Sequence, residues 1–237
     1  EDARQLNLDK LIELAYDPRL TAFEVLIPGL VAAWDAQPGD DPEMAAAVEA
    51  LRNWDFSVSA ESVPMSLAQY YGQEYLRNGA APEGLNYIER ITYYGQDSPE
   101  AERLQIFAAS LSKLKEDFGQ WDTAWGEINR YQRLNGDIQQ PFNDDQPSVA
   151  IPMASSRWGA LASFGARTYP GTKRMYGTSG NSFVAVVEFG DKVKAKSLLA
   201  GGQSGDPASP HFDDQVDLYV RGEFKDVAYY RPDVEAR

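Results

Sequence analysis

Apolar residues in the first half of the chain recur with the period of an α-helix. The first set marks one face of a helix that Pro18 ends, and it consists of Leu8, Leu11, Ile12 and Ala15. The same period predicts four more helices, which cover residues 23–34, 43–54, 66–76 and 100–118. We therefore expect the N-terminal half to be helical.

Local signals predict where two of these helices begin. Thr21 is expected to be an N-cap, and Glu24, three places on, completes a capping box. Ser98 is expected to cap the longest helix, with Pro99 at its first position. Pro28 lies inside an apolar run and should kink or split that helix, because proline removes a backbone donor.

The pattern changes near residue 136, where Gly, Pro, Asp and Ser become frequent and the apolar runs become short and alternating. Residues 183–189 are rich in valine, which predicts a buried strand. Gly190 and Asp191 are expected to turn this strand back into residues 193–200, so that the two form a hairpin. The end of the chain is predicted to hold a short helix or a pair of strands, at residues 218–220 and 224–230.

These patterns predict an α+β protein, in which a helical region (residues 1–135) is followed by a β-rich region (residues 136–237). A chain of 237 residues can bury an ample core, so the two regions are expected to form one compact unit. The hydrophobic fraction of 43% is that of an ordinary globular protein, and an aromatic fraction of 12% argues against disorder.

Charge and the rarity of certain residues exclude several functions. A net charge of −14 repels phosphate backbones and anionic lipid, so neither nucleic acid nor a membrane is an expected partner. The absence of cysteine excludes thiolate metal sites and cysteine nucleophiles, and the single histidine, His211, cannot form a multi-histidine metal site. The most apolar stretch, residues 25–34, is too short to span a membrane. We expect no metal and no cofactor.

One stretch gathers the residue types of a hydrolytic triad. Ser204, His211, Asp213 and Asp214 lie within about a dozen residues, and a triad needs a base near the serine and a carboxylate to orient the imidazole. The stretch G-Q-S-G-D, however, does not match the G-x-S-x-G nucleophile elbow. The favoured interpretation is a structural loop in which the aspartates form turns. We expect His211 to be packed or hydrogen-bonded within this loop, away from any serine.

Two acidic stretches and three tyrosine pairs offer weaker candidates. Residues 40–43 and 143–145 lack the spacing of a calcium loop, and a helix N-terminus better explains the charge of Asp41 and Glu43. The tyrosine pairs at 70–71, 93–94 and 229–230 are expected to lie in the core rather than to stack on a ligand. From the chemistry of the residues alone, no convincing active site emerges.

Three segments carry a resemblance to a known family. G-Q-S-G-D-P-A-S-P-H-F-D-D-Q at residues 202–215 follows a predicted strand, W-G-E-I-N-R stands at 125–130, and R-N-W-D at 52–55 ends a predicted helix. Together they resemble segments of the penicillin acylase family, which includes acyl-homoserine lactone acylases and cephalosporin acylases. The similarity extends over nearly the whole chain.

The resemblance implies that the chain is the C-terminal part of the β chain of an N-terminal-nucleophile amidohydrolase, and a portion of its αββα fold. Such enzymes are exported precursors that cut themselves into two chains, which implies a periplasmic or secreted location. The new terminal serine attacks an amide with its own α-amino group as base, and an asparagine and backbone amides form the oxyanion hole.

No catalytic position of that family maps onto this chain. The family's serine, histidine, asparagine and arginine all precede the region matched by residues 1–30, and His211 matches the C-terminal motif instead. The chain opens at Glu1 and not at methionine, which favours a piece of a longer precursor. We therefore expect no catalytic, cofactor or metal residues and no activity from the chain alone.

The favoured function is that of a C-terminal fragment of an amidohydrolase that cleaves the N-acyl amide bonds of acyl-homoserine lactones or β-lactam antibiotics, with a lean toward the lactone branch. Its expected partners are the missing N-terminal part or α chain and, in the whole enzyme, a small N-acyl substrate. The alternative is a non-catalytic binding or interaction module that retains the fold. Exposed strand edges are expected to allow self-association.

Overall fold

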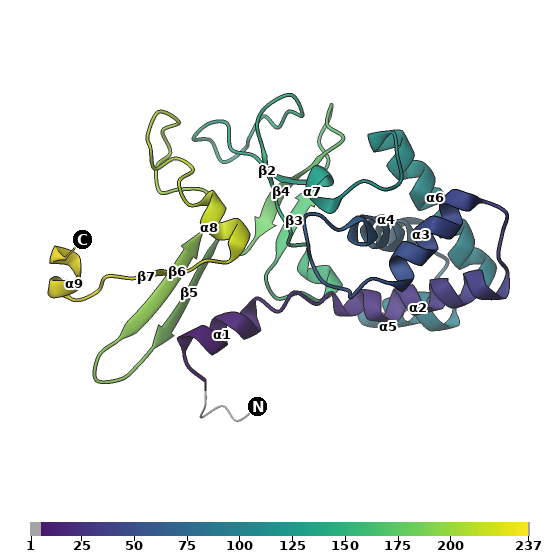
Figure 1. Cartoon of the computed structure of the whole chain (residues 1–237), viewed down its shortest axis with the longest axis horizontal. Coiled ribbons are helices and arrows are strands. Elements are labelled where there is room, and N and C mark those ends of the chain that lie inside the picture. Colours follow the sequence, from purple (N-terminus) through teal and green to yellow (C-terminus); the bar gives the residue numbers. More distant parts are fainter. Residues whose placement is uncertain (1–5, 237) are drawn as a thin grey trace.

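A computed structural model describes residues 6–236. It confirms the predicted α+β class: helices fill one end of an elongated molecule, and two small sheets occupy the middle and the other end (Figure 1). Among the described residues no helix combines the length and apolarity that a membrane crossing requires.

The predicted helices are all present, with ends that shift by a few residues. The helical segments of the first half are α1 (Leu8–Ala15), α2 (Thr21–Ala36), α3 (Pro42–Arg52), α4 (Val63–Asn78), α5 (Tyr87–Thr92), the π-helix η2 (Tyr93–Asp97), α6 (Glu100–Phe118) and the short α7 (Trp125–Ile128). Neither α5 nor η2 was expected from the apolar period. A capping box formed by Asn86 and Glu89 begins α5.

The two predicted helix starts are wrong. Thr21 is the first residue of α2 rather than its cap, and Glu24 accepts a hydrogen bond of 2.7 Å from the Arg19 guanidinium instead of closing a capping box. Ser98 makes no cap for α6, because its hydroxyl is drawn into the core, where it donates to the carbonyl of Tyr94 at 2.8 Å. A buried tertiary contact has replaced the local one.

Of the two outcomes expected at Pro28, a kink or a split of its helix, the split does not occur. The helix α2 runs unbroken from Thr21 to Ala36 with Pro28 inside it. It packs against α3, η2 and α6, and one face is fully buried. Tertiary packing therefore outweighs the backbone hydrogen bond that proline removes.

The strands form two sheets. The first has the order β2-β1-β4-β3, from β1 (Asn129–Tyr131), β2 (Val149–Ala150), β3 (Phe164–Arg167) and β4 (Met175–Gly180), and in it β1 and β4 are parallel. The second has the order β5-β6-β7, from β5 (Phe183–Glu188), β6 (Lys194–Leu199) and β7 (Lys225–Asp226), all antiparallel. The remaining helical segments are η3 (Ser156–Trp158), α8 (Val216–Arg221) and α9 (Arg231–Glu235).

The β5–β6 hairpin confirms the predicted hairpin, but β5 is not a buried strand. Val186 is its one buried residue, while Phe183 is 65% exposed and Val187 also faces solvent. The helix α1 lies against β5 (Figure 1). One edge of β5 pairs with β6, and the other edge has no partner strand among the described residues. The valine-rich sequence reflects strand propensity here, not burial on both faces.

Residues of the second half close the core of the helices. Trp158 of η3 is buried and stacks on Phe23 of α2, with ring centroids 4.8 Å apart. A Cβ at position 72 of α4 would lie 2.6 Å from the Trp158 ring, so Gly72 is required for this packing. The helices and the first sheet are consequently joined by a continuous apolar core.

Candidate functional site

The loop of residues 201–215, which carries the triad-like residues, is held in place by one arginine. The Arg133 guanidinium donates to the carbonyl oxygens of Phe212 at 2.6 Å and Ser204 at 2.8 Å, and it lies 4.2 Å from the centre of the Phe212 ring. Gly202 allows the two ends of the loop to pack against each other, since a Cβ there would lie 2.2 Å from the His211 carbonyl oxygen. The loop is therefore braced by Arg133, which agrees with the structural role expected of it.

Within this loop the structure brings together a histidine and a carboxylate, but no serine joins them. His211 Nδ1 lies 2.8 Å from Asp214 Oδ2, and the imidazole side chain is 70% exposed. The Ser204 hydroxyl accepts from the Asp206 amide and the Ser209 hydroxyl from the His211 amide. Among residues 6–236 no hydrogen bond links either hydroxyl to the imidazole, so the expectation of His211 bonded within the loop and apart from the serines is confirmed.

The W-G-E-I-N-R segment is a second brace. Gly126 packs so closely that a Cβ would lie 2.9 Å from the β-carbons of Ala60 and Ala150. Asn129 donates from its amide to two carbonyl oxygens of the segment that follows β2, at 2.9 and 2.8 Å. Arg130 donates to the Gly126 carbonyl at 2.7 Å. These side chains fix the junction between α7 and the first sheet.

The carboxylates of the acidic stretches accept hydrogen bonds from backbone amides and from a tyrosine hydroxyl. Asp41 accepts hydrogen bonds from the first amides of α3, which confirms its expected place at a helix N-terminus. Asp144 accepts from the Tyr176 hydroxyl at 2.8 Å and from the Lys173 amide at 2.7 Å. In the described part of the chain no cluster of three or more His, Cys, Asp or Glu side chains could hold a metal ion.

The tyrosine pairs divide into two groups. Tyr70, Tyr71 and Tyr94 are buried in the helical core, as predicted, and Tyr71 packs edge-on against Phe107. For the last pair the prediction is wrong, because Tyr229 is exposed. It follows β7 at the end of the chain, where no apolar layer covers it.

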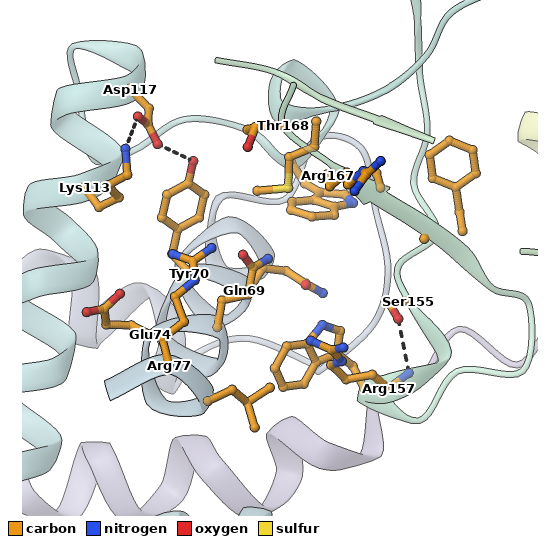
Figure 2. Close-up of a pocket in the computed structure, with 18 of the residues that line it drawn as sticks. Gln69, Tyr70, Glu74, Arg77, Lys113, Asp117, Ser155, Arg157, Arg167 and Thr168 are labelled. Atoms are coloured by element: carbon orange, nitrogen blue, oxygen red, sulfur yellow. Dashed lines mark hydrogen bonds and ion pairs between the residues drawn. The ribbon is translucent and has the colours of Figure 1, made fainter. Parts of the chain in front are cut away.

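A cavity of about 640 Å³ lies between the helices and the first sheet. Helices α4 and α6 form one wall, and β3, β4 and the segment around η3 form the other (Figure 2). Its volume is in the range of small-molecule sites in proteins. Sequence patterns did not indicate this cavity, because its lining residues come from six separate elements and the segments between them.

On the helix wall of the cavity, a tyrosine and a lysine share one carboxylate. Tyr70 donates to Asp117 Oδ2 at 3.0 Å, and Lys113 pairs with the other oxygen, as Figure 2 shows. Burial first, and then the negative charge of Asp117, hold the pKa of Tyr70 well above its ordinary value. Tyr70 therefore acts as a hydrogen-bond donor at neutral pH and not as a base.

The rim of the cavity is cationic and largely unpaired. Five cationic and two anionic side chains line it, in a chain whose net charge is −14. Within the described residues no carboxylate oxygen lies within 4 Å of the charged nitrogens of Arg77, Arg157, Arg167 or Lys173. The arrangement is suited to holding an anion, not to activating a nucleophile.

Comparison with known proteins gives the chain a family. A family model described as penicillin amidase matches residues 1–236. Among solved structures, a thermostable penicillin G acylase from Alcaligenes faecalis is similar over 97% of this chain, with 16% sequence identity and a TM-score of 0.48. The chain covers 48% of that acylase chain and so spans about half its length. Since the family model covers almost every residue, the chain belongs to the penicillin amidase family.

Proposed function

We propose that this chain is the C-terminal part of an amidohydrolase that cleaves N-acyl amide bonds. The observation that carries the proposal is the match to the penicillin amidase family model over residues 1–236. In the whole enzyme a terminal serine outside this chain attacks the amide carbonyl, and its α-amino group takes the proton. Hydrolysis then releases a carboxylic acid and an amine.

In this proposal the chain supplies scaffold rather than nucleophile. Its family-like segments are occupied in bracing: Arg133 holds the loop of residues 201–215, and Arg130 holds the start of the first sheet. The hydroxyls of Ser204 and Ser209 accept hydrogen bonds from backbone amides, and neither is paired with His211. The chain therefore orders the part of the enzyme against which the catalytic half is built.

The substrates proposed for the whole enzyme are acyl-homoserine lactones or β-lactam antibiotics. Either class presents an N-acyl amide to the same chemistry, and the enzyme would serve in quorum quenching or in antibiotic metabolism accordingly. The proposed location is the periplasm or the outside of the cell. Support for these finer statements comes from family membership alone.

The alternative function is a non-catalytic binding module that keeps the family fold. The observation in its favour is the cation-rimmed cavity, which needs no nucleophile to bind a ligand. Under this alternative, the gene product would bind N-acyl compounds without hydrolysing them.

The test is to express the complete gene product and to measure release of chromophore from an N-acyl anilide. A matched pair of variants separates folding from chemistry: Arg133→Gln removes the loop brace, and Arg231→Gln alters an exposed arginine of α9. We expect hydrolysis by the complete protein and by Arg231→Gln, and loss of folded enzyme for Arg133→Gln. A folded complete protein that binds N-acyl compounds without turnover would establish the binding module instead.

A further inference from the structure

The cavity between the helices and the first sheet has a charge opposite to that of the molecule. Arg77 of α4 lies on one wall, and Arg157 of η3 and Arg167 of β3 lie on the other (Figure 2). Lys173, from the segment before β4, also lines the cavity. These four cations have no carboxylate partner among the described residues, and like charges that line one cavity repel each other. Binding of a negative group would relieve that repulsion. Salt screens the acidic surface farther away, so the nearby cations determine the local attraction for an anion.

In the wall of the cavity one buried polar group lacks a hydrogen-bond partner. Gln69 lines the cavity from α4 and is 2% exposed, and its amide nitrogen Nε2 has no hydrogen-bond partner among the described residues. A buried amide donor without an acceptor is destabilising. An anionic oxygen in the cavity is the kind of acceptor that this donor lacks.

The remainder of the lining combines apolar and aromatic side chains with neutral polar ones from Gln, Ser and Thr residues. The apolar and aromatic side chains belong to Leu76, Trp125, Trp158, Phe164 and Met175. Ligand sites commonly combine an apolar body with polar groups that fix orientation. The cavity offers both components, with charged groups at its rim and neutral polar groups, Gln69 among them, in its walls.

We propose that this cavity binds an organic anion in which a carboxylate or sulfonate is joined to an apolar ring system. The charged group lies among the guanidinium groups of the rim, and the rings lie against the aromatic lining. This proposal stands apart from amidase activity, because it uses groups of this chain alone. It holds equally for a fragment of an enzyme and for a binding module.

The test compares two fluorescent probes of the same shape. Anilinonaphthalenesulfonate carries the anion, and phenylnaphthylamine has the same rings without it. We expect the folded chain of residues 1–237 to bind the sulfonate with one-to-one stoichiometry, at least about tenfold more tightly than the neutral probe. Raising the salt concentration should weaken the sulfonate alone, because its binding depends on charge.

Variants locate the binding. Arg77→Gln and Arg167→Gln lie on opposite walls, and each should weaken sulfonate binding about three- to tenfold without altering the neutral probe. Arg231→Gln, on exposed α9, is the matched control and should leave both affinities unchanged. These arginines are exposed, so their replacement does not endanger folding.

Gln69→Leu separates a binding role from a structural one. In the free protein the change removes an unpartnered donor, so we expect an equal or higher melting temperature together with weaker sulfonate binding. Equal affinity for the two probes, or unchanged sulfonate binding in both arginine variants, would overturn the proposal and assign the dye to apolar surface elsewhere. Capture of an acidic peptide such as polyglutamate, without any binding of the sulfonate, would overturn it in favour of a polypeptide partner.

Discussion

The helical end of the molecule and the β5–β6–β7 sheet contain similar apolar residues but bury them to very different extents. Phe23 and Phe107 in the helical core have no exposed surface, whereas Phe183 and Phe189 at the hairpin are 65% and 84% exposed. The apolar cluster under the hairpin is also much smaller than that among the helices. The helices complete their own core, while the hairpin leaves apolar surface of the kind that another polypeptide covers.

Close backbone contact explains why the helical end is so well packed. Gly29 of α2 and Gly95 of η2 touch, and a Cβ on Gly29 would lie 1.9 Å from the Gly95 carbonyl oxygen. Arg103 of α6 is buried beside them and donates to the carbonyls of Tyr94 and Gly29, each at 3.2 Å. The hairpin sheet has no comparable buried polar anchor among the described residues.

The largest expected loss of stability comes from truncating a side chain in the helical core. Phe107→Ala should lower the free energy of unfolding by about 3–5 kcal/mol, because it removes a buried aromatic side chain and leaves a cavity. Phe189→Ala, the matched change on the hairpin, should cost less than about 0.5 kcal/mol. Urea denaturation followed by circular dichroism measures both. Equal losses would remove the contrast between the two regions.

A second, smaller effect is expected at the buried arginine. Arg103→Ala should destabilise the protein by about 2–4 kcal/mol, since it empties a buried site and leaves the Ser98 hydroxyl without its charged neighbour. Arg77→Ala is the control, because that side chain is exposed and unpaired with any described carboxylate. If Arg103→Ala left the melting temperature unchanged, the stability of the helical end would not depend on this buried arginine.

Alkaline unfolding should distinguish buried from exposed tyrosines. Burial first, and then a hydrogen bond to Asp144, raise the pKa of Tyr176 to about 12, against about 10 in an unfolded chain. Its contribution to stability is complete below pH 10 and is lost as pH rises toward about 12, because the unfolded state releases the proton first. Tyr176→Phe should reduce this loss, and Tyr229→Phe, at an exposed position, should not. Denaturation curves over the alkaline range would decide; the same effect from both variants would contradict the assignment.

The smallest expected effect on folding, but a visible one in solution, concerns association. The open edge of β5 and its exposed phenylalanines should make the isolated chain form dimers or larger species. Phe183→Ser together with Phe189→Ser should shift sedimentation velocity profiles toward the monomer, with stability nearly unchanged. A wild-type chain that stays monomeric at high concentration would show that the exposed apolar surface of the hairpin does not drive association.

The sequence predicted what depends on local periodicity. The helix at residues 100–118 was predicted with its observed limits, and the β5–β6 hairpin followed from valine-rich runs around a Gly-Asp turn. Strands β1 to β4 were not predicted. Strands β1 and β2 have only three and two residues, and β3 and β4 contain glycine within the run where apolar alternation is sought. Ser98 was assigned wrongly, because a buried arginine in the next helix engages its side chain.

The two candidate sites also differ in how far the sequence predicts them. The loop of residues 201–215 was found because all its unusual residues are contiguous, and its bracing by Arg133 agrees with a structural role. The cation-rimmed cavity could not be predicted, since its arginines are ordinary surface residues until folding places α4 opposite β3. Only the tertiary structure shows that they share one opening.

We propose that this chain is part of an amidohydrolase and does not itself contain a complete catalytic centre, and the most direct test is an assay of the chain alone. Purified residues 1–237 and the Ser204→Ala variant are incubated with a chromogenic N-acyl anilide, and chromophore release is followed with time. We predict no turnover above buffer for either protein, because the proposal places the nucleophile outside this chain. Hydrolysis by the unmodified chain that disappears in Ser204→Ala would contradict the claim and place the active site in the loop with His211 and Asp214.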